Sequence, residues 1–88
     1  MTERPSLLEF PTSFPLKAIG TGPEDFEHVV VEIVRRHIPV LAEDCATTRL
    51  SGGGKYLAVT VTFMAESQAQ LDALYGELTE HERVVMLL

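Results

Sequence analysis

The chain has 88 residues and carries 13 acidic against 7 basic side chains, a formal net charge of −6. This length predicts one domain that buries roughly 60% of the surface its unfolded chain exposes, and the negative charge argues against binding to a nucleic-acid backbone. The single cysteine, Cys45, excludes an internal disulfide and, without a Cys/His cluster, a thiolate metal site within one chain.

The first residues predict an arm rather than a leader segment. They lack the charged start, long apolar run and cleavage site of a signal peptide, and no later apolar run is long enough to span a bilayer. We therefore expect a cytoplasmic protein with no membrane partner. Residues 1–12 carry Leu7, Leu8 and Phe10 before a Pro-Thr-Ser turn signal. We predict that they form an N-terminal arm packed on a single domain of residues 13–88.

Alternation of apolar residues predicts a first strand over residues 14–20, with Pro15 near its start. A helix is predicted over residues 23–37, because Thr21 and Glu24 have the capping-box spacing and Pro23 suits a first helical turn. Five apolar residues and one histidine recur at helical spacing and form one stripe: Phe26, Val29, Val30, Ile33, Val34 and His37.

The clearest strand signal lies in residues 55–64. Apolar residues alternate there with small or hydroxylic ones, so we predict a strand covered on one side only, its buried set being Leu57, Val59, Val61 and Phe63. The alternation in residues 43–50 is thin, which predicts a strand at an edge of the sheet. The glycine-rich residues 51–54 predict a hairpin turn between the two strands.

The last third of the chain predicts a second helix and a final strand. Ser67 and Gln70 repeat the capping-box spacing, and Gly76 is a weak point in the helix interior. The helix face is marked by Leu71, Leu74, Tyr75 and Leu78. In residues 83–88, Arg83 suits an outward position, so we assign the alternate set to the core: Val84, Met86 and Leu88.

The predicted order is β-α-β-β-α-β, which indicates an α+β, ferredoxin-like βαββαβ sandwich. Such a fold has a four-stranded antiparallel sheet with two helices on one face, and its first and third strands are central. The other face stays uncovered, and we take its residues as the candidate interaction face: Lys17, Ile19, Tyr56, Ala58, Thr60 and Thr62.

No motif predicts catalysis. The run from Ser51 to Lys55 lacks the phosphate-loop spacing, and a chain without asparagine, with no arginine in its first loop, disfavours acylphosphatase-like chemistry. On the central strand Tyr56 is the one outward aromatic, so the stacking platform of an RNA-recognition domain is missing. The acidic neighbours of Cys45 disfavour a reactive thiolate.

The three histidines, His28, His37 and His81, have no metal-ligand spacing. We therefore expect no catalytic residue, no metal and no cofactor. The acids of the first helix are interpreted as a solvated face, or alternatively as a surface that a basic partner recognises: Glu24, Asp25, Glu27 and Glu32.

Several segments carry a family resemblance: residues 7–12 with Phe14 and residues 17–20, the helix end at 34–37, the turn at 51–56 with Val59 and Val61, and the close at 74–78 and 84–88. Their order and spacing resemble the YbeD-like family of small uncharacterised bacterial proteins. The resemblance implies a ferredoxin-like domain similar to the ACT-type regulatory domains of amino-acid-metabolism enzymes, with no established activity.

ACT-type domains commonly bind small effectors near the loop after the first strand, at an interface between two domains. The resemblance therefore implies a candidate effector site at Gly20, Thr21 and Gly22, where glycine lets a ligand approach the backbone. The same glycines are also explained by the end of a strand and the start of a helix.

Two functions follow from the sequence. The first is a non-enzymatic regulatory or protein-interaction module that pairs its sheet edge or open face with itself or with an unidentified protein. The alternative is an ACT-like domain that binds a small effector such as an amino acid.

Overall fold

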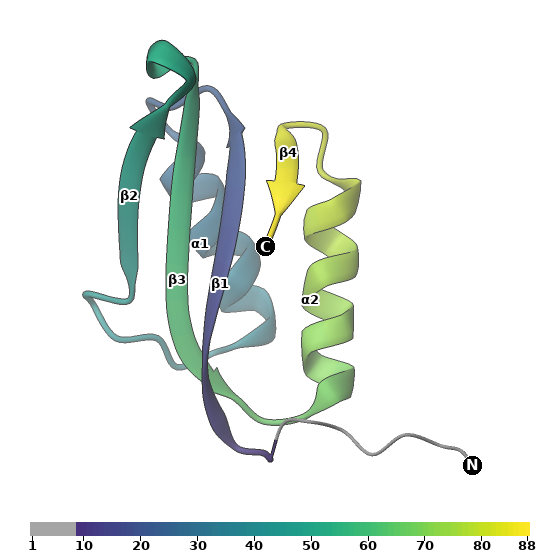
Figure 1. The fold of residues 1–88 in the computed structure, drawn as a ribbon. Coiled ribbons are helices and arrows are strands. Elements are labelled where there is room, and N and C mark those ends of the chain that lie inside the picture. The colour runs from purple at the N-terminus through teal and green to yellow at the C-terminus, as the bar shows by residue number, and fades with distance from the viewer. Residues whose placement is uncertain (1–8) are drawn as a thin grey trace.

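Four antiparallel strands form one sheet in the order β2-β3-β1-β4, with two helices packed against it (Figure 1). The computed structural model describes residues 9–88. In chain order the elements are β1 (Thr12–Thr21), α1 (Phe26–His37), β2 (Ala46–Ser51), β3 (Tyr56–Ala65), α2 (Gln68–Glu80) and β4 (Val84–Leu87). A short 3-10 turn at Gly52–Gly54 closes the β2–β3 hairpin. This arrangement confirms the predicted α+β ferredoxin-like fold.

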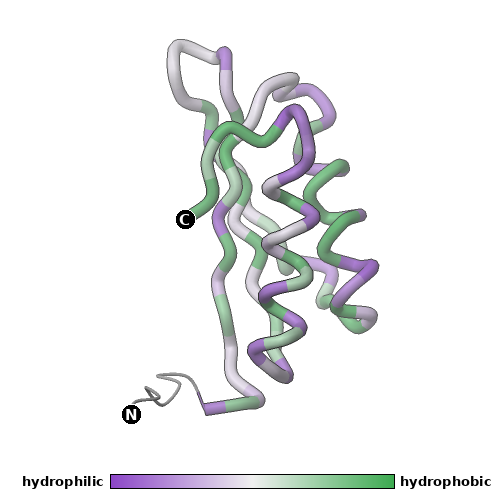
Figure 2. Tube along the Cα trace, turned by 90° about the vertical axis from the view of Figure 1, so that its right-hand side faces the viewer, coloured by the Kyte–Doolittle hydropathy of each residue, from purple (hydrophilic) through white to green (hydrophobic). Residues whose placement is uncertain are grey.

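Both helices cover the same face of the sheet, as the side view shows (Figure 2). The alternation of β3 decides which residues they cover: Val59 and Val61 are fully buried, whereas Thr60 is half-buried and Thr62 is exposed. The core is entirely apolar. Its largest fully buried side chains are Phe26, Leu16, Leu74, Leu78, Val30, Val34, Val59 and Val61.

Helix α1 begins at Phe26, later than the predicted start at Pro23. Residues 23–25 form a turn instead, in which the Asp25 and Phe26 amides both donate to the Gly22 carbonyl, at 3.2 and 3.1 Å. Gly22 makes this turn possible because its φ is 73°, a value that side chains other than glycine rarely adopt. No side chain caps the helix, so the capping box predicted for Thr21 is wrong.

The predicted cap of α2 is confirmed. The Gln70 amide donates to the Ser67 hydroxyl at 3.1 Å, and the Gln70 side chain accepts from the Glu66 amide at 2.8 Å. The same side chain donates to the carbonyl of His37 at the end of α1, at 3.1 Å. Gln70 therefore joins the start of one helix to the end of the other.

Replacing Gly76 by alanine is expected to stabilise the protein. Gly76 lies inside α2 and is exposed, and a Cβ added to it would meet open space beside the helix. Alanine loses less backbone entropy than glycine on entering a helix, so Gly76→Ala should raise the free energy of unfolding by about 0.5–1 kcal/mol. Urea unfolding followed by circular dichroism measures this difference, and a lower midpoint for the variant would contradict it.

The register of β4 corrects the assignment made from its alternation. Ala18 pairs with Leu87 and Ile19 with Met86, but a bulge follows and Gly20 pairs with Val84. The extra residue reverses the alternation, so Leu87 packs on the core while Met86 and Leu88 are 49% and 60% exposed. Of the predicted core set, only Val84 packs against the core.

The two edge strands of the sheet, β2 and β4, differ in how much of their neighbour they pair with. β2 forms one edge, as predicted, and every residue after Ala46 in it is exposed. At the other edge, the Lys17 amide donates to Leu88 O at 3.4 Å. Backbone groups two residues apart in a strand point to the same side, so the Pro15 nitrogen also points to this edge, beyond the end of β4. Pro15 is tolerated within β1 because its missing N–H would face no strand.

The N-terminal arm is described only in part. β1 begins at Thr12, and Phe10 packs partly buried against the core. Leu7 and Leu8, which the arm prediction also used, lie outside the described residues. Among residues 9–88, no helix is long and apolar enough to cross a membrane.

Candidate functional site

The strand register places the six predicted outward residues together on the uncovered face. Across the central pair of strands, Lys17 lies opposite Thr60 and Ile19 opposite Ala58. Tyr56 and Thr62 continue the same alternation along β3. We call these six residues, together with Arg49 and Met86, the open sheet face.

Arg49 and Met86 are two members that the prediction did not include. Arg49 lies opposite Ala58, and Met86 lies opposite Ile19, so one row of side chains runs across all four strands. The signal for Arg49 was present in the alternation of β2. The outward position of Met86 could not be predicted, because the bulge reverses which residues of β4 face outward.

The open sheet face has an apolar centre. Ala58 is 7% exposed, Ile19 is half-buried beside it, and Met86 is 49% exposed. Tyr56 and Thr60 are half-buried, while Lys17, Arg49 and Thr62 reach solvent. This combination of a shallow apolar floor and a polar margin resembles the anatomy of protein interfaces.

The charge of this face is opposite to that of the chain. None of the four described strands contains an aspartate or glutamate, although the chain has 13 acidic residues. Lys17 and Arg49 are the charged residues of the open sheet face. The acids lie on the helices, the loops and the N-terminal segment, so the uncovered side of the sheet is basic within an acidic protein.

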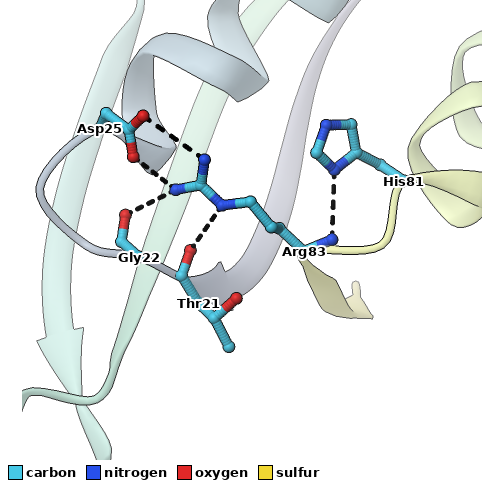
Figure 3. A network of polar contacts seen from close by, with 5 residues as sticks. All are labelled: Thr21, Gly22, Asp25, His81 and Arg83. Carbon is cyan, nitrogen blue, oxygen red and sulfur yellow. Dashed lines mark hydrogen bonds and ion pairs between the residues drawn. The ribbon is translucent and has the colours of Figure 1, made fainter.

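Two residues of the predicted effector loop, Thr21 and Gly22, contact Arg83 (Figure 3). The Arg83 guanidinium donates from Nη2 to Gly22 O at 2.8 Å and from Nε to Thr21 O at 3.2 Å. The Thr21 amide in turn donates to Arg83 O at 3.1 Å. A Cβ added to Gly22 would overlap the guanidinium, so the space next to this glycine belongs to Arg83.

Arg83 also pairs with Asp25 at the start of α1. Its Nη2 lies 2.5 Å from Asp25 Oδ1, and its guanidinium carbon lies 5.8 Å from the centre of the Phe26 ring. The hydrogen bond from Arg83 lowers the pKa of Asp25, and the same bond raises the pKa of Arg83. The backbone amide of Arg83 donates to His81 Nδ1 at 3.2 Å. These contacts tie the residues before β4 to the loop between β1 and α1.

A second ion pair joins the two helices. Glu77 of α2 accepts a hydrogen bond from Arg36, and Glu77 Oε1 lies 2.7 Å from His37 Nε2. The hydrogen bond from Arg36, followed by that from His37, lowers the pKa of Glu77. His37 therefore contacts a carboxylate, in addition to its favourable place at the end of α1.

Replacing Glu77 by glutamine is expected to make the protein less stable at neutral pH. A carboxyl whose pKa falls on folding stabilises the folded state above its unfolded pKa, and this stabilisation is lost as the pH falls through the folded pKa. The side chains are partly exposed, so the loss should be about 1 kcal/mol or less. Urea unfolding at neutral and at acidic pH measures it. A stability difference between wild type and Glu77→Gln that grows on acidification would contradict a stabilising role of the Glu77 carboxylate.

The histidines, the cysteine and the acids of residues 9–88 form no metal centre. Within residues 9–88, no group of three histidine, cysteine or acidic side chains could hold a metal ion. His37 contacts Glu77 and His81 contacts the Arg83 amide, so these two histidines have structural partners on separate elements. Cys45 is half-buried beside β2, and its carbonyl accepts the Thr62 amide at 2.9 Å.

Comparison with known proteins places the chain in a family. The family model described as "Protein of unknown function (DUF493)" matches residues 5–88. A UPF0250 protein of Chromobacterium violaceum is 45% identical over 86 residues, covering 98% of this chain and 97% of the relative. A UPF0250 protein of Neisseria gonorrhoeae is 45% identical over 91 residues and covers 100% of both chains. One of Leptothrix cholodnii is 43% identical over 83 residues, covering 94% of this chain and 91% of its own. The chain therefore belongs to the DUF493 (UPF0250) family of small bacterial proteins of unknown function, which is the YbeD-like family that its segments resemble.

Proposed function

We propose that this protein is a non-enzymatic interaction module whose open sheet face binds an acidic and partly apolar surface of a partner protein. The observation that carries the proposal is the charge of this face. In a chain with a net charge of −6, the uncovered side of the sheet presents Lys17 and Arg49 and no acid. Opposite charges across an interface speed association and disfavour wrong partners.

The apolar centre supports the same proposal. Ile19 and Ala58 form a shallow floor, and Met86 next to them is 49% exposed. Methionine is enriched at the centre of interfaces because its flexible side chain adapts to the partner. Two copies of this protein meeting through like faces would bring Lys17 and Arg49 of one copy towards those of the other. A different, acidic partner therefore fits this face better than a second copy.

The effector alternative at Gly20, Thr21 and Gly22 has less support. Arg83 already binds the carbonyls of Thr21 and Gly22, and the backbone of Gly20 is buried against Phe26. The hypothesis stays a prediction that thermal unfolding with added amino acids tests. A ligand that binds only the folded state raises the melting temperature.

Affinity capture with charge-reversal variants tests the proposal. The immobilised protein is incubated with bacterial extract as wild type, as Lys17→Glu/Arg49→Glu, and as the control Arg35→Glu, whose site is an exposed residue of α1. We expect a partner that wild type and control retain equally, that the double variant loses, and that rising salt releases. A partner retained equally by all three proteins would contradict the proposal. So would the absence of any retained protein at low salt.

A further inference from the structure

A hollow of about 630 Å³ lies at the free edge of β3, beyond the start of β2. One wall is the chain after α1, and the other is the end of β3. Two of the side chains that line it are apolar and exposed: Val40 is 85% exposed and Met64 is 51% exposed. The rest of its apolar lining is Ile38, Pro39, Leu41, Ala42 and Phe63. Large apolar side chains rarely gather around a hollow at the surface unless it binds something.

The backbone beside this hollow has a free hydrogen-bonding edge. The Thr62 amide donates to Cys45 O at 2.9 Å, and β2 pairs with β3 no further than Ala46 opposite Val61. In an antiparallel ladder every second residue directs its backbone groups to the same side. Met64 therefore directs its N–H and C=O past the end of β2, where no strand of residues 9–88 pairs with it. An extended peptide can add to such an edge as a short strand.

The charges around the hollow favour a basic occupant. Glu66 lines it, and no lysine or arginine does among the described residues. Two further exposed acids, Glu43 and Asp44, directly follow the wall formed by residues 38–42. A basic side chain at one end of an apolar peptide would thus meet an acidic margin.

We propose that this hollow binds an extended peptide segment of a partner protein, with apolar side chains at alternate positions and a lysine or arginine that meets Glu66. The peptide continues the line of β2 along β3 and pairs with the backbone of Met64. Its apolar side chains contact the walls that carry Val40 and Phe63. This site lies at the edge of the sheet and shares Thr62 with the open sheet face, but it includes neither Lys17 nor Arg49.

Nuclear magnetic resonance with synthetic peptides tests this inference on the full chain. The probe is an amide-capped hexapeptide in which an initial lysine is followed by alternating valine and threonine. In the control peptide, glutamate replaces the lysine. At saturation, we expect hydrogen exchange of the Met64 amide to slow by about tenfold or more, because it gains a backbone partner. The lysine peptide should bind more tightly than the glutamate peptide.

Two variants with matched exposure locate the site. Met64→Lys should weaken binding of the lysine peptide by about tenfold, because it adds a like charge inside the hollow. Val85→Lys changes a side chain of similar exposure, 57%, on β4, and should leave the affinity unchanged. Equal weakening by both variants would overturn the inference, as would an unperturbed Met64 amide with either peptide. The Met64 amide could also be protected from hydrogen exchange without any peptide. If Leu7→Asp/Leu8→Asp removed that protection, this chain would fill the hollow itself, and the inference of a partner peptide would be overturned.

Discussion

Replacing Val61 by aspartate is expected to abolish cooperative folding. Val61 is fully buried between the sheet and the helices, in a core whose residues are all apolar. A carboxylate there would lose its hydration and find no partner, at a cost of several kcal/mol. That cost is comparable with the 5–15 kcal/mol by which typical domains are stable. The thermal transition followed by circular dichroism should disappear or shift far down.

The neighbouring residue provides the matched control. Thr62 is exposed on the opposite side of the same strand, so Thr62→Asp keeps the new carboxylate in water. We expect its effect on the free energy of unfolding to stay within about 1 kcal/mol. If Thr62→Asp unfolded the protein while Val61→Asp left it intact, the two faces of the sheet would be reversed.

Replacing Gly20 by valine is expected to have the second largest effect. Gly20 is buried at the bulge between β1 and β4, and a Cβ there would overlap the Phe26 ring and lie 2.5 Å from Arg83 O. The ring is itself fully buried and the carbonyl is backbone, so neither gives way easily. Overpacking costs about 1–3 kcal/mol, and an overlap with backbone as well as with a buried ring belongs at the upper end of that range.

Gly76→Val serves as the control for this substitution, since an added Cβ at Gly76 meets open space. Chemical unfolding of both variants separates steric overlap from the general effect of removing a glycine. A Gly20→Val protein as stable as the control would show that the loop after β1 has spare room. The effector hypothesis for residues 20–22 would then gain support.

The sequence predicted those parts of the fold that depend on local pattern. The alternation in β3 placed Val59 and Val61 in the core, and the spacing of Ser67 and Gln70 located the start of α2. The open sheet face followed because its residues alternate with the core residues. These features need only neighbouring residues and the period of a strand or helix.

Features set by contacts between distant residues were missed. The turn that delays the start of α1 contains Asp25, which pairs with Arg83, 58 positions away. A bulge in the pairing of two strands reverses the exposure of Met86, and no local pattern in β4 reports it. The hollow beside Met64 likewise depends on where β2 stops pairing with β3. The last two are properties of strand register, which one sequence does not reveal.

The proposed function makes the open sheet face the surface that the partner touches, and site-specific photo-crosslinking in living bacteria tests this most directly. A photoreactive amino acid is placed at Thr60, in the middle of the open sheet face, or at Glu32, an exposed residue of α1. We expect a discrete crosslinked product with a second protein from position 60 and none from position 32. A product from position 32 alone, or none from position 60 at normal expression, would contradict the assignment of this face.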